Sequence, residues 1–230
     1  MKRVILLILV SLLNASIFAQ VKYPSRDSKE WNNLTVVQRW QAVNIPEDSL
    51  SKMSTIELID HCLNFNFMWD IFNHPNYEIG LNVVIENHNG LRELLKRKDA
   101  GELILEYYRK INLEEVIKMD KPADRGKFVG KAFFLELFLS HPNILNQFQG
   151  NEQRVIAAIL QTYDTCLKIN EENDRDYYCG YSIGTKIMAI GRGLDHLNNR
   201  ETTDMAIEDL DLSKLTDEHC RKIIEEARKL

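Results

Sequence analysis

The sequence predicts an all-α protein, folded as a single globular array of short antiparallel helices. Apolar residues recur every three or four positions along most of the chain, and signals that start a helix precede several of these segments. No segment alternates between apolar and polar residues for long enough to form a strand. Within the all-α class, the alternative architecture is an irregular α-solenoid of the HEAT or armadillo type.

Residues 1–19 have the pattern of a secretory signal peptide. Lys2 and Arg3 form a positive n-region, residues 4–13 are apolar with one exception, and Ala19 supplies a small residue at the cleavage point. This apolar run is much shorter than the roughly 20 residues that span a membrane, and no cysteine follows it for a lipid anchor. We therefore expect a periplasmic or secreted protein that has no membrane contact after signal cleavage.

The mature chain is expected to be acidic and to form one domain. Loss of Lys2 and Arg3 lowers the count of basic residues from 29 to 27 against 34 acidic ones, so the net charge becomes −7. The two signs are interspersed without a basic stripe, which argues against nucleic acid as a partner. The apolar share of 44% suits a packed globule. We expect residues 20–33 to form a loose arm and residues 34–230 a single helical domain.

The strongest helix start lies at Ser54. Its side chain can accept from the backbone N–H of Glu57 while Glu57 reaches back to the N–H of Ser54, and Met53 and Leu58 can form a hydrophobic staple around this capping box. The apolar residues that follow are too many for a surface helix, so we expect a helix buried on most sides and interrupted near residues 64–66. These apolar residues are Leu58, Ile59, Cys62, Leu63, Met68, Trp69, Ile71 and Phe72.

Three further short helices are expected after this one. His74-Pro75 should separate two helices, because proline cannot continue a helix but fits the first turn of the next. Gly90 should close the second helix with a left-handed cap, and residues 91–97 should form the third. Asp99 and Glu102 have the spacing of a second capping box and should start the fourth.

The rest of the chain also has helical periodicity. The expected helices are residues 34–43 with an apolar face of Val36, Val37, Trp40 and Val43, a densely apolar central helix over 128–139, a long helix after Asn151, its partner over 177–197 and an amphipathic helix over 216–230. His141-Pro142 repeats the pattern of His74-Pro75. A repeated helix–stop–helix unit is one interpretation, and a shared punctuation dipeptide, which we favour, is the other.

Several short motifs resemble uncharacterised exported all-helical proteins of Gram-negative bacteria. The resemblance covers about residues 45–110 and implies export and a helical fold, with no activity attached. The motifs are Ile45-Pro46, Met53-Ser54-Thr55, Cys62-Leu63-Asn64, Asn89-Gly90-Leu91-Arg92-Glu93-Leu94 and Arg97-Lys98-Asp99-Ala100.

Four cysteines in an exported chain allow three disulfide connectivities. Cys166 and Cys179 are nearly equidistant from the charged turn 171–176, so an antiparallel hairpin would bring them to the same level. We expect these two residues to be in contact, either as a disulfide or as two buried thiols. We expect Cys62 and Cys220 to be unpaired.

Motifs for catalysis or metal binding are weak. Gly180 to Lys186 is one residue short of a P-loop and follows no strand, so close helix packing explains its glycines better. No two histidines have the spacing of a zinc helix, and the run from Asn170 to Asp176 lacks the glycine and the final glutamate of a calcium loop. Glu57 and His61 lie one turn apart as base and orienter would, yet such pairs are common on helix surfaces. We assign no catalytic, cofactor-binding or metal-binding residue.

Five aromatic residues are candidates for a binding groove, although aromatics at helical spacing more often pack in a core. They are Trp31, Trp40, Trp69, Tyr107 and Tyr108.

Two classes of function fit these features. The favoured one is an exported, non-enzymatic interaction module that binds a protein or a glycan. The alternative is a periplasmic or secreted hydrolase that acts on glycan or cell wall through a carboxylate pair assembled only in three dimensions. A pocket with two carboxylates about 5–10 Å apart, one of them desolvated, would favour the hydrolase.

The helical pattern also predicts which residues form the core. We expect residues 55–111 to form short helices packed on the central helix, with Leu58, Cys62, Leu63 and Phe134 buried. Replacement of Leu63 by Ala should then lower the free energy of unfolding by about 2–5 kcal/mol, because the methyl groups lose their burial and leave a cavity. Denaturant unfolding measures this loss, and a value below about 1 kcal/mol would place Leu63 outside the core.

Overall fold

The computed structural model describes residues 28–173, 179–198 and 211–230, and within these ranges it contains helices and no strand. The all-α prediction is confirmed. The helices are α2 (Lys29–Asn32), α3 (Val36–Ala42), α4 (Glu47–Leu50), α5 (Thr55–Leu63), η1 (Asn66–Asn73), α6 (Tyr77–Asn87), α7 (Asn89–Leu94), α8 (Ala100–Arg109), η2 (Leu113–Lys118), α9 (Pro122–Leu139), α10 (Pro142–Leu145), η3 (Asn146–Phe148), α11 (Gln153–Asn173), α12 (Cys179–Leu197), η5 (Leu212–Lys214) and α13 (Asp217–Ala227), where η denotes a 3-10 helix.

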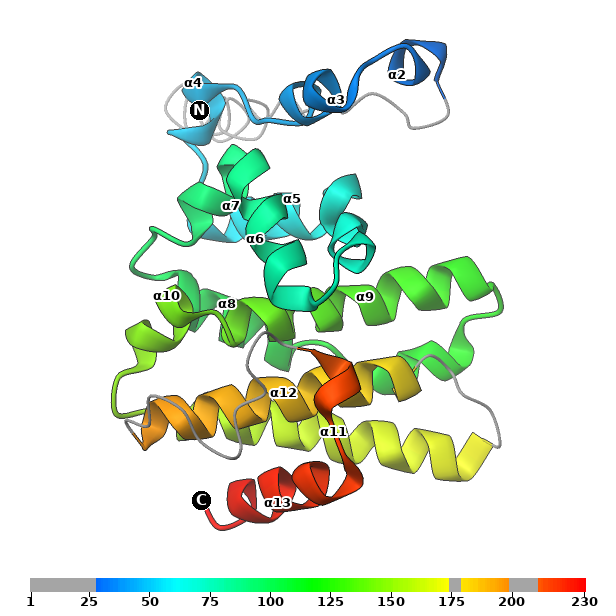
Figure 1. Cartoon of the computed structure of the whole chain (residues 1–230), viewed down its shortest axis with the longest axis vertical. Coiled ribbons are helices and arrows are strands. Elements are labelled where there is room, and N and C mark those ends of the chain that lie inside the picture. The colour runs from blue at the N-terminus through cyan, green and yellow to red at the C-terminus, as the bar shows by residue number, and fades with distance from the viewer. Residues whose placement is uncertain (1–27, 174–178, 199–210) are drawn as a thin grey trace, which may run out of the picture.

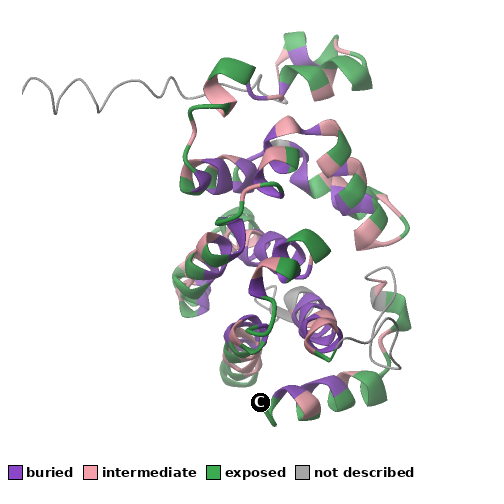
Figure 2. Cartoon of the chain, turned by 90° about the vertical axis from the view of Figure 1, so that its left-hand side faces the viewer, coloured by how far each residue is buried: buried purple, intermediate pink, exposed green. Residues whose placement is uncertain are grey.

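The helices follow one another in layers along the longest axis of the molecule. Helices α2 to α4 lie at one end, α5 to α7 form the next layer, α8 to α10 the middle, α11 and α12 the layer after it, and α13 the other end (Figure 1). Buried residues face the neighbouring layers and exposed ones face outward (Figure 2). None of the helices in the described ranges has both the length and the hydropathy that crossing a membrane requires. The signal sequence expected at residues 1–19 lies outside these ranges.

The first layer is thinly packed. Trp31 of α2 is buried, and its ring centroid lies 5.4 Å from that of Phe67, while Trp40 of α3 lies 4.4 Å from the same ring. Val36 and Val37, predicted on the apolar face of this helix, are instead 65% and 66% exposed. The reason is position, since α3 lies at the end of the array and has a neighbouring layer on one side only (Figure 1).

The helix start predicted at Ser54 is confirmed. The Ser54 backbone N–H donates to Glu57 Oε2 at 2.8 Å, and the Ser54 hydroxyl oxygen accepts from the Glu57 N–H at 3.4 Å. The predicted interruption also occurs, because α5 ends at Leu63 and the chain continues as the 3-10 helix η1. The four core residues predicted from the pattern, Leu58, Cys62, Leu63 and Phe134, are all buried.

The left-handed cap predicted at Gly90 is wrong. Gly90 lies inside α7, and the one described glycine with a positive φ is Gly150. His88 makes the junction instead, since its Nδ1 accepts from the backbone N–H of Leu91 at 3.2 Å and starts α7 directly after α6. A Cβ on Gly90 would lie 2.7 Å from both the His88 ring and Ile45, so close packing explains this glycine.

The second predicted capping box is also wrong. Helix α8 begins after Asp99, but the Asp99 carboxylate accepts from the Thr55 hydroxyl at 2.8 Å and makes no cap bond. Glu102 forms a two-bond ion pair with Arg154, at 2.5 and 2.8 Å. Asp99 and Glu102 therefore bind partners from other layers and not each other's backbone groups. Their spacing in the sequence does not reveal these distant partners.

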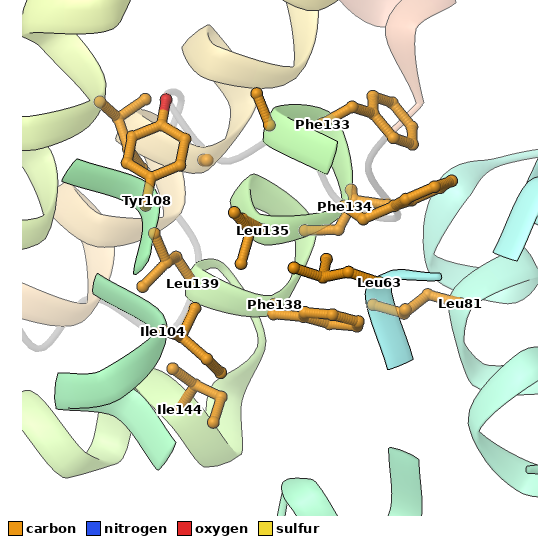
Figure 3. Close-up of a cluster of buried hydrophobic side chains, with 14 of the residues drawn as sticks. Leu63, Leu81, Ile104, Tyr108, Phe133, Phe134, Leu135, Phe138, Leu139 and Ile144 are labelled. Carbon is orange, nitrogen blue, oxygen red and sulfur yellow. The ribbon is translucent and has the colours of Figure 1, made fainter. Parts of the chain in front are cut away.

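Helix α9 is the central helix that the apolar pattern predicts, but it begins earlier, at Pro122, where proline occupies the first turn. Figure 3 shows Phe134 and Phe138 of α9 beside Leu63 and Leu81. The expectation that short helices pack on the central helix is thereby confirmed.

The two His-Pro dipeptides have different structural roles. His74 and Pro75 precede Asn76, whose side chain caps α6 by accepting from Ile79 N–H at 2.8 Å. His141 is itself the cap of α10, and Pro142 is the first residue of that helix. This difference favours shared punctuation over a repeated unit.

Helices α11 and α12 pack along each other as the predicted hairpin, and α13 covers them with Ile223, Ile224 and Ala227 (Figure 1). Cys62 and Cys220 are free thiols, as predicted. Cys166 is buried on α11, but the predicted contact with Cys179 falls on a side chain outside the described residues.

A charged group lies at the centre of the core. Glu136 of α9 and Lys186 of α12 are completely buried, and Lys186 Nζ donates to Glu136 Oε1 at 2.7 Å. The same carboxylate accepts from the Tyr108 hydroxyl at 2.9 Å and from the Thr185 hydroxyl at 2.7 Å. The Tyr108 hydroxyl also contacts the Thr162 hydroxyl, and burial beside Glu136 raises the pKa of Tyr108 well above its usual value. Residues of α8, α9, α11 and α12 thus share one polar network.

Removal of one partner from this network should be costly. We expect Lys186→Met to lower the free energy of unfolding by about 3–5 kcal/mol, because it leaves the Glu136 carboxylate buried without its cation. The double variant Lys186→Met with Glu136→Leu should lose less than the sum of the two single variants, by about 1 kcal/mol or more. Urea unfolding of the four proteins measures both quantities, and strictly additive losses would contradict the coupling.

Candidate functional site

A pocket of about 700 Å³ lies where the end of α8 meets η2 and the first half of α9, with the end of α5 and η1 on the other side. Its volume falls in the range of small-ligand sites. Its lining mixes aromatic rings, amides and charges. The lining residues are Leu63, Asn64, Phe65, Trp69, Tyr107, Lys110, Ile111, Asn112, Glu115, Asp124, Lys127, Phe128, Lys131 and Phe134.

One face of α9 forms a whole wall of this pocket. The lining residues of this helix, which follow the three- and four-residue spacing that places side chains on one face, are Asp124, Lys127, Phe128, Lys131 and Phe134. The wall extends from Asp124 to Phe134; its first residues, such as Lys127, are exposed, whereas every residue from Ala132 to the end of the helix is buried among other layers. The same helix therefore serves both the core and the pocket.

Trp69 is the largest side chain of the lining, and it was predicted to be mostly buried. It is 40% exposed, and Phe72 is 45% exposed, so this part of the prediction is wrong. The cause is the 3-10 geometry of η1, in which residues three apart eclipse. Trp69 and Phe72 thus share the outer side, while Met68 and Ile71 share the buried side.

Gly130 of α9 makes room for Trp69. A Cβ at this position would lie 2.5 and 2.7 Å from two atoms of the six-membered indole ring. The Phe134 ring packs edge-on against Trp69 with centroids 5.2 Å apart, and the Phe72 ring stacks at 5.8 Å. The indole is therefore held in place by its neighbours although much of it faces solvent.

The five aromatic candidates separate into two groups. Trp31 and Tyr108 are buried in the core and Trp40 packs half-buried against it, as aromatics at helical spacing usually do. Trp69 and Tyr107 line the pocket. The sequence could not separate the two groups, because the burial of each ring depends on which helices of the neighbouring layers cover it in the folded protein.

Tyr107 is tied to the preceding layer. Its hydroxyl donates to Asp60 Oδ1 at 3.1 Å. Partial burial, the charge of Asp60 and this hydrogen bond all raise the pKa of Tyr107. The phenol therefore stays protonated at neutral pH and presents a fixed aromatic ring to the pocket.

The charges of the lining are unevenly paired. Glu115 binds Lys118 at 2.7 Å. Lys110, Lys127 and Lys131 take part in none of the ion pairs formed among the described residues. Asp124 likewise takes part in none of these pairs, so the pocket presents three cationic side chains and one further carboxylate to a ligand.

The carboxylates of the pocket do not form the arrangement expected of a hydrolase. Glu115 and Asp124 both line it, but the Glu115 side chain is 43% exposed and Asp124 is exposed as well. A general acid that works at neutral pH needs a desolvated carboxyl whose proton is retained. Neither residue has that environment.

The other chemical candidates do not converge on a site. The Glu57 carboxylate serves the capping box, while the ring of His61 lies 6.2 Å from that of His88. Burial lowers the pKa of His61 against the opposing charge of Asp60, and burial is the main cause that lowers the pKa of His88 to about 3. Lys186, the last residue of the P-loop-like run, is held by Glu136 in the core.

Metal-binding side chains are likewise scattered. Within the described residues, no three His, Cys, Asp or Glu side chains come together as a metal site would require. The calcium-loop candidate from Asn170 to Asp176 lies partly outside those residues.

The contact of Gly130 with Trp69 can be tested directly. We expect Gly130→Ala to displace the indole and to lower the free energy of unfolding by about 1–3 kcal/mol, because the added methyl overpacks the contact. Gly126→Ala on the same helix is the matched control, since its Cβ would meet nothing within 4 Å. That control should gain up to about 1 kcal/mol from helix propensity. Unfolding curves and the accessibility of Trp69 to a fluorescence quencher, in a Trp31→Phe, Trp40→Phe background, measure both effects, and equal behaviour of the two alanine variants would contradict the contact.

Comparison of the chain with protein-family models, with curated proteins and with solved structures finds no match. The resemblance of residues 45–110 to exported helical proteins stays a prediction. The pocket is interpreted from its own residues.

Proposed function

We propose that the protein is an exported, non-enzymatic binding module that holds a segment of a glycan or of a protein in the pocket beside Trp69. The observation that carries this proposal is the tryptophan itself. It is 40% exposed, yet its indole is held against the backbone of α9 at Gly130 and against the ring of Phe134. A preorganised aromatic ring loses little conformational entropy on binding and contributes a large contact area.

The composition of the lining also supports binding. Trp69 and the half-buried Phe128 supply apolar surface, and the amides of Asn64 and Asn112 supply donors and acceptors. Sites for small ligands combine apolar walls with a few polar groups in this way. The expected export of the chain would place the pocket in the periplasm or outside the cell, where glycans and protein surfaces are available.

The hydrolase alternative has one observation in its favour, which is that Glu115 and Asp124 share the pocket. Both are exposed, and Glu115 is paired with Lys118. Because catalysis of glycoside hydrolysis needs one carboxyl that keeps its proton, this environment favours binding over hydrolysis.

A capture experiment tests the proposed function. The mature protein, immobilised, should retain a glycan or protein from the native envelope fraction, and Trp69→Ala should lose that ligand by about tenfold or more in affinity, since truncation of a buried aromatic anchor typically costs 2 kcal/mol or more. Ile79→Ala is the control, because Ile79 is similarly exposed at 44% but does not line the pocket. Circular dichroism confirms that each variant is folded. Equal retention of the ligand by Trp69→Ala and the wild type would show that the ligand does not bind in this pocket.

A further inference from the structure

The pocket concentrates unpaired positive charge in an acidic protein. The whole chain has a formal net charge of −5, with 34 acidic residues. Lys110, Lys127 and Lys131 nevertheless converge on one pocket, where they outnumber the two carboxylates of the lining, Asp124 and Glu115, of which Glu115 is already bound by Lys118. This local excess of positive charge opposes the charge of the protein as a whole.

These lysines differ from the basic residues that stabilise the packing. Arg154, Arg192 and Arg228 each bind a carboxylate from another helix, namely Glu102, Glu78 and Asp164. The three pocket lysines have no such role among the ion pairs of the described residues. Their ammonium groups are therefore available for a ligand.

The spacing of the lysines suits a ligand with repeated negative charges. Lys127 and Lys131 lie one turn apart on the same face of α9, so their Cβ atoms are about 5–6 Å apart. Lys110 approaches the pocket from the end of α8. A chain that carries one carboxylate on each sugar ring offers such repeated charges, and the helical turn of about 5.4 Å between the two lysines sets the spacing that its carboxylates must match.

We propose that the pocket binds an acidic glycan, an oligosaccharide that carries uronic acid carboxylates, and this inference rests on the proposed binding function. The lysines pair with the carboxylates, Trp69 and Tyr107 contact the apolar C–H surface of the sugar rings, and Asn64 and Asn112 lie within the same lining to bind hydroxyls. An acidic peptide would use the lysines equally well. The mixture of aromatic and amide groups favours a glycan, because every sugar ring has an apolar face and a polar edge.

The test uses oligogalacturonates and alginate oligomers as probes of the mature protein by isothermal titration calorimetry. Their carboxyl-reduced derivatives, which keep the rings but lose the charge, are the matched ligands. We expect at least one acidic oligomer to bind at least tenfold more tightly than its reduced form. Binding should weaken as sodium chloride is raised, because salt screens exposed charges.

Variants separate charge from packing. Lys127→Gln with Lys131→Gln should weaken binding of the acidic oligomer at least tenfold and bring it close to the affinity of the reduced form. Lys52→Gln with Lys96→Gln removes the same charge from two exposed residues outside the lining and should leave the affinity unchanged.

The outcomes distinguish this inference from the proposed function. If reduced and acidic oligomers bind equally and Trp69→Ala abolishes both, the binding function stands and the acidic ligand is wrong. If poly-glutamate binds through Lys127 and Lys131 while no oligosaccharide does, the ligand is an acidic protein segment and the glycan is wrong. If none of these probes binds, the acidic glycan is wrong, and capture with Trp69→Ala decides the binding function separately.

Discussion

The buried pair of Glu136 and Lys186 is the constraint on which the arrangement of the helices depends. A carboxylate and an ammonium group removed from water are tolerated only when their hydrogen bonds are satisfied. Here Tyr108 and Thr185 complete the shell of the carboxylate, and Tyr108 also contacts Thr162 of α11, so four helices from two neighbouring layers must meet at one point. Any other register of these helices would leave at least one of the buried charged groups without its partner, which is strongly unfavourable.

This constraint also positions the pocket. Glu136 fixes the end of α9 among α8, α11 and α12, and the helix extends from there toward its N-terminus past the residues that line the pocket beside η1. Lys127 and Lys131 are one to three turns away from Glu136 on this same helix, so their placement follows from the packing of the core. The buried charge and the pocket lysines thus lie at different positions along a single helix, and Lys127 and Lys131 can be changed without loss of the buried charges.

Local signals predicted the parts of the fold whose partners are close in sequence. The capping box of Ser54 and Glu57 formed because both partners belong to one helical turn, and the apolar pattern correctly marked Leu63 and Phe134 as core. Asp99 and Glu102 have the same spacing, yet their side chains bind Thr55 and Arg154 from other layers. Trp69 and Tyr107 were among the predicted groove candidates, but the lysines and the pocket itself were not predicted, because the elements that form it come together only in three dimensions.

Glycine shows most clearly why sequence alone stops short of the site. In the sequence, Gly130 lies inside the predicted central helix, where glycine is unfavourable, and Gly90 was predicted to end a helix, because glycine is common at helix ends. In the structure both are helical, and each is required by what lies against it, the indole of Trp69 in one case and the ring of His88 in the other. Because glycine has no side chain, the sequence does not indicate which residue packs against it. The exposure of Trp69 and the glycine at position 130 are explained together, because Gly130 leaves the space in which the indole is held. The indole then forms a fixed aromatic part of the pocket lining, and the lysines of α9 form its charged part.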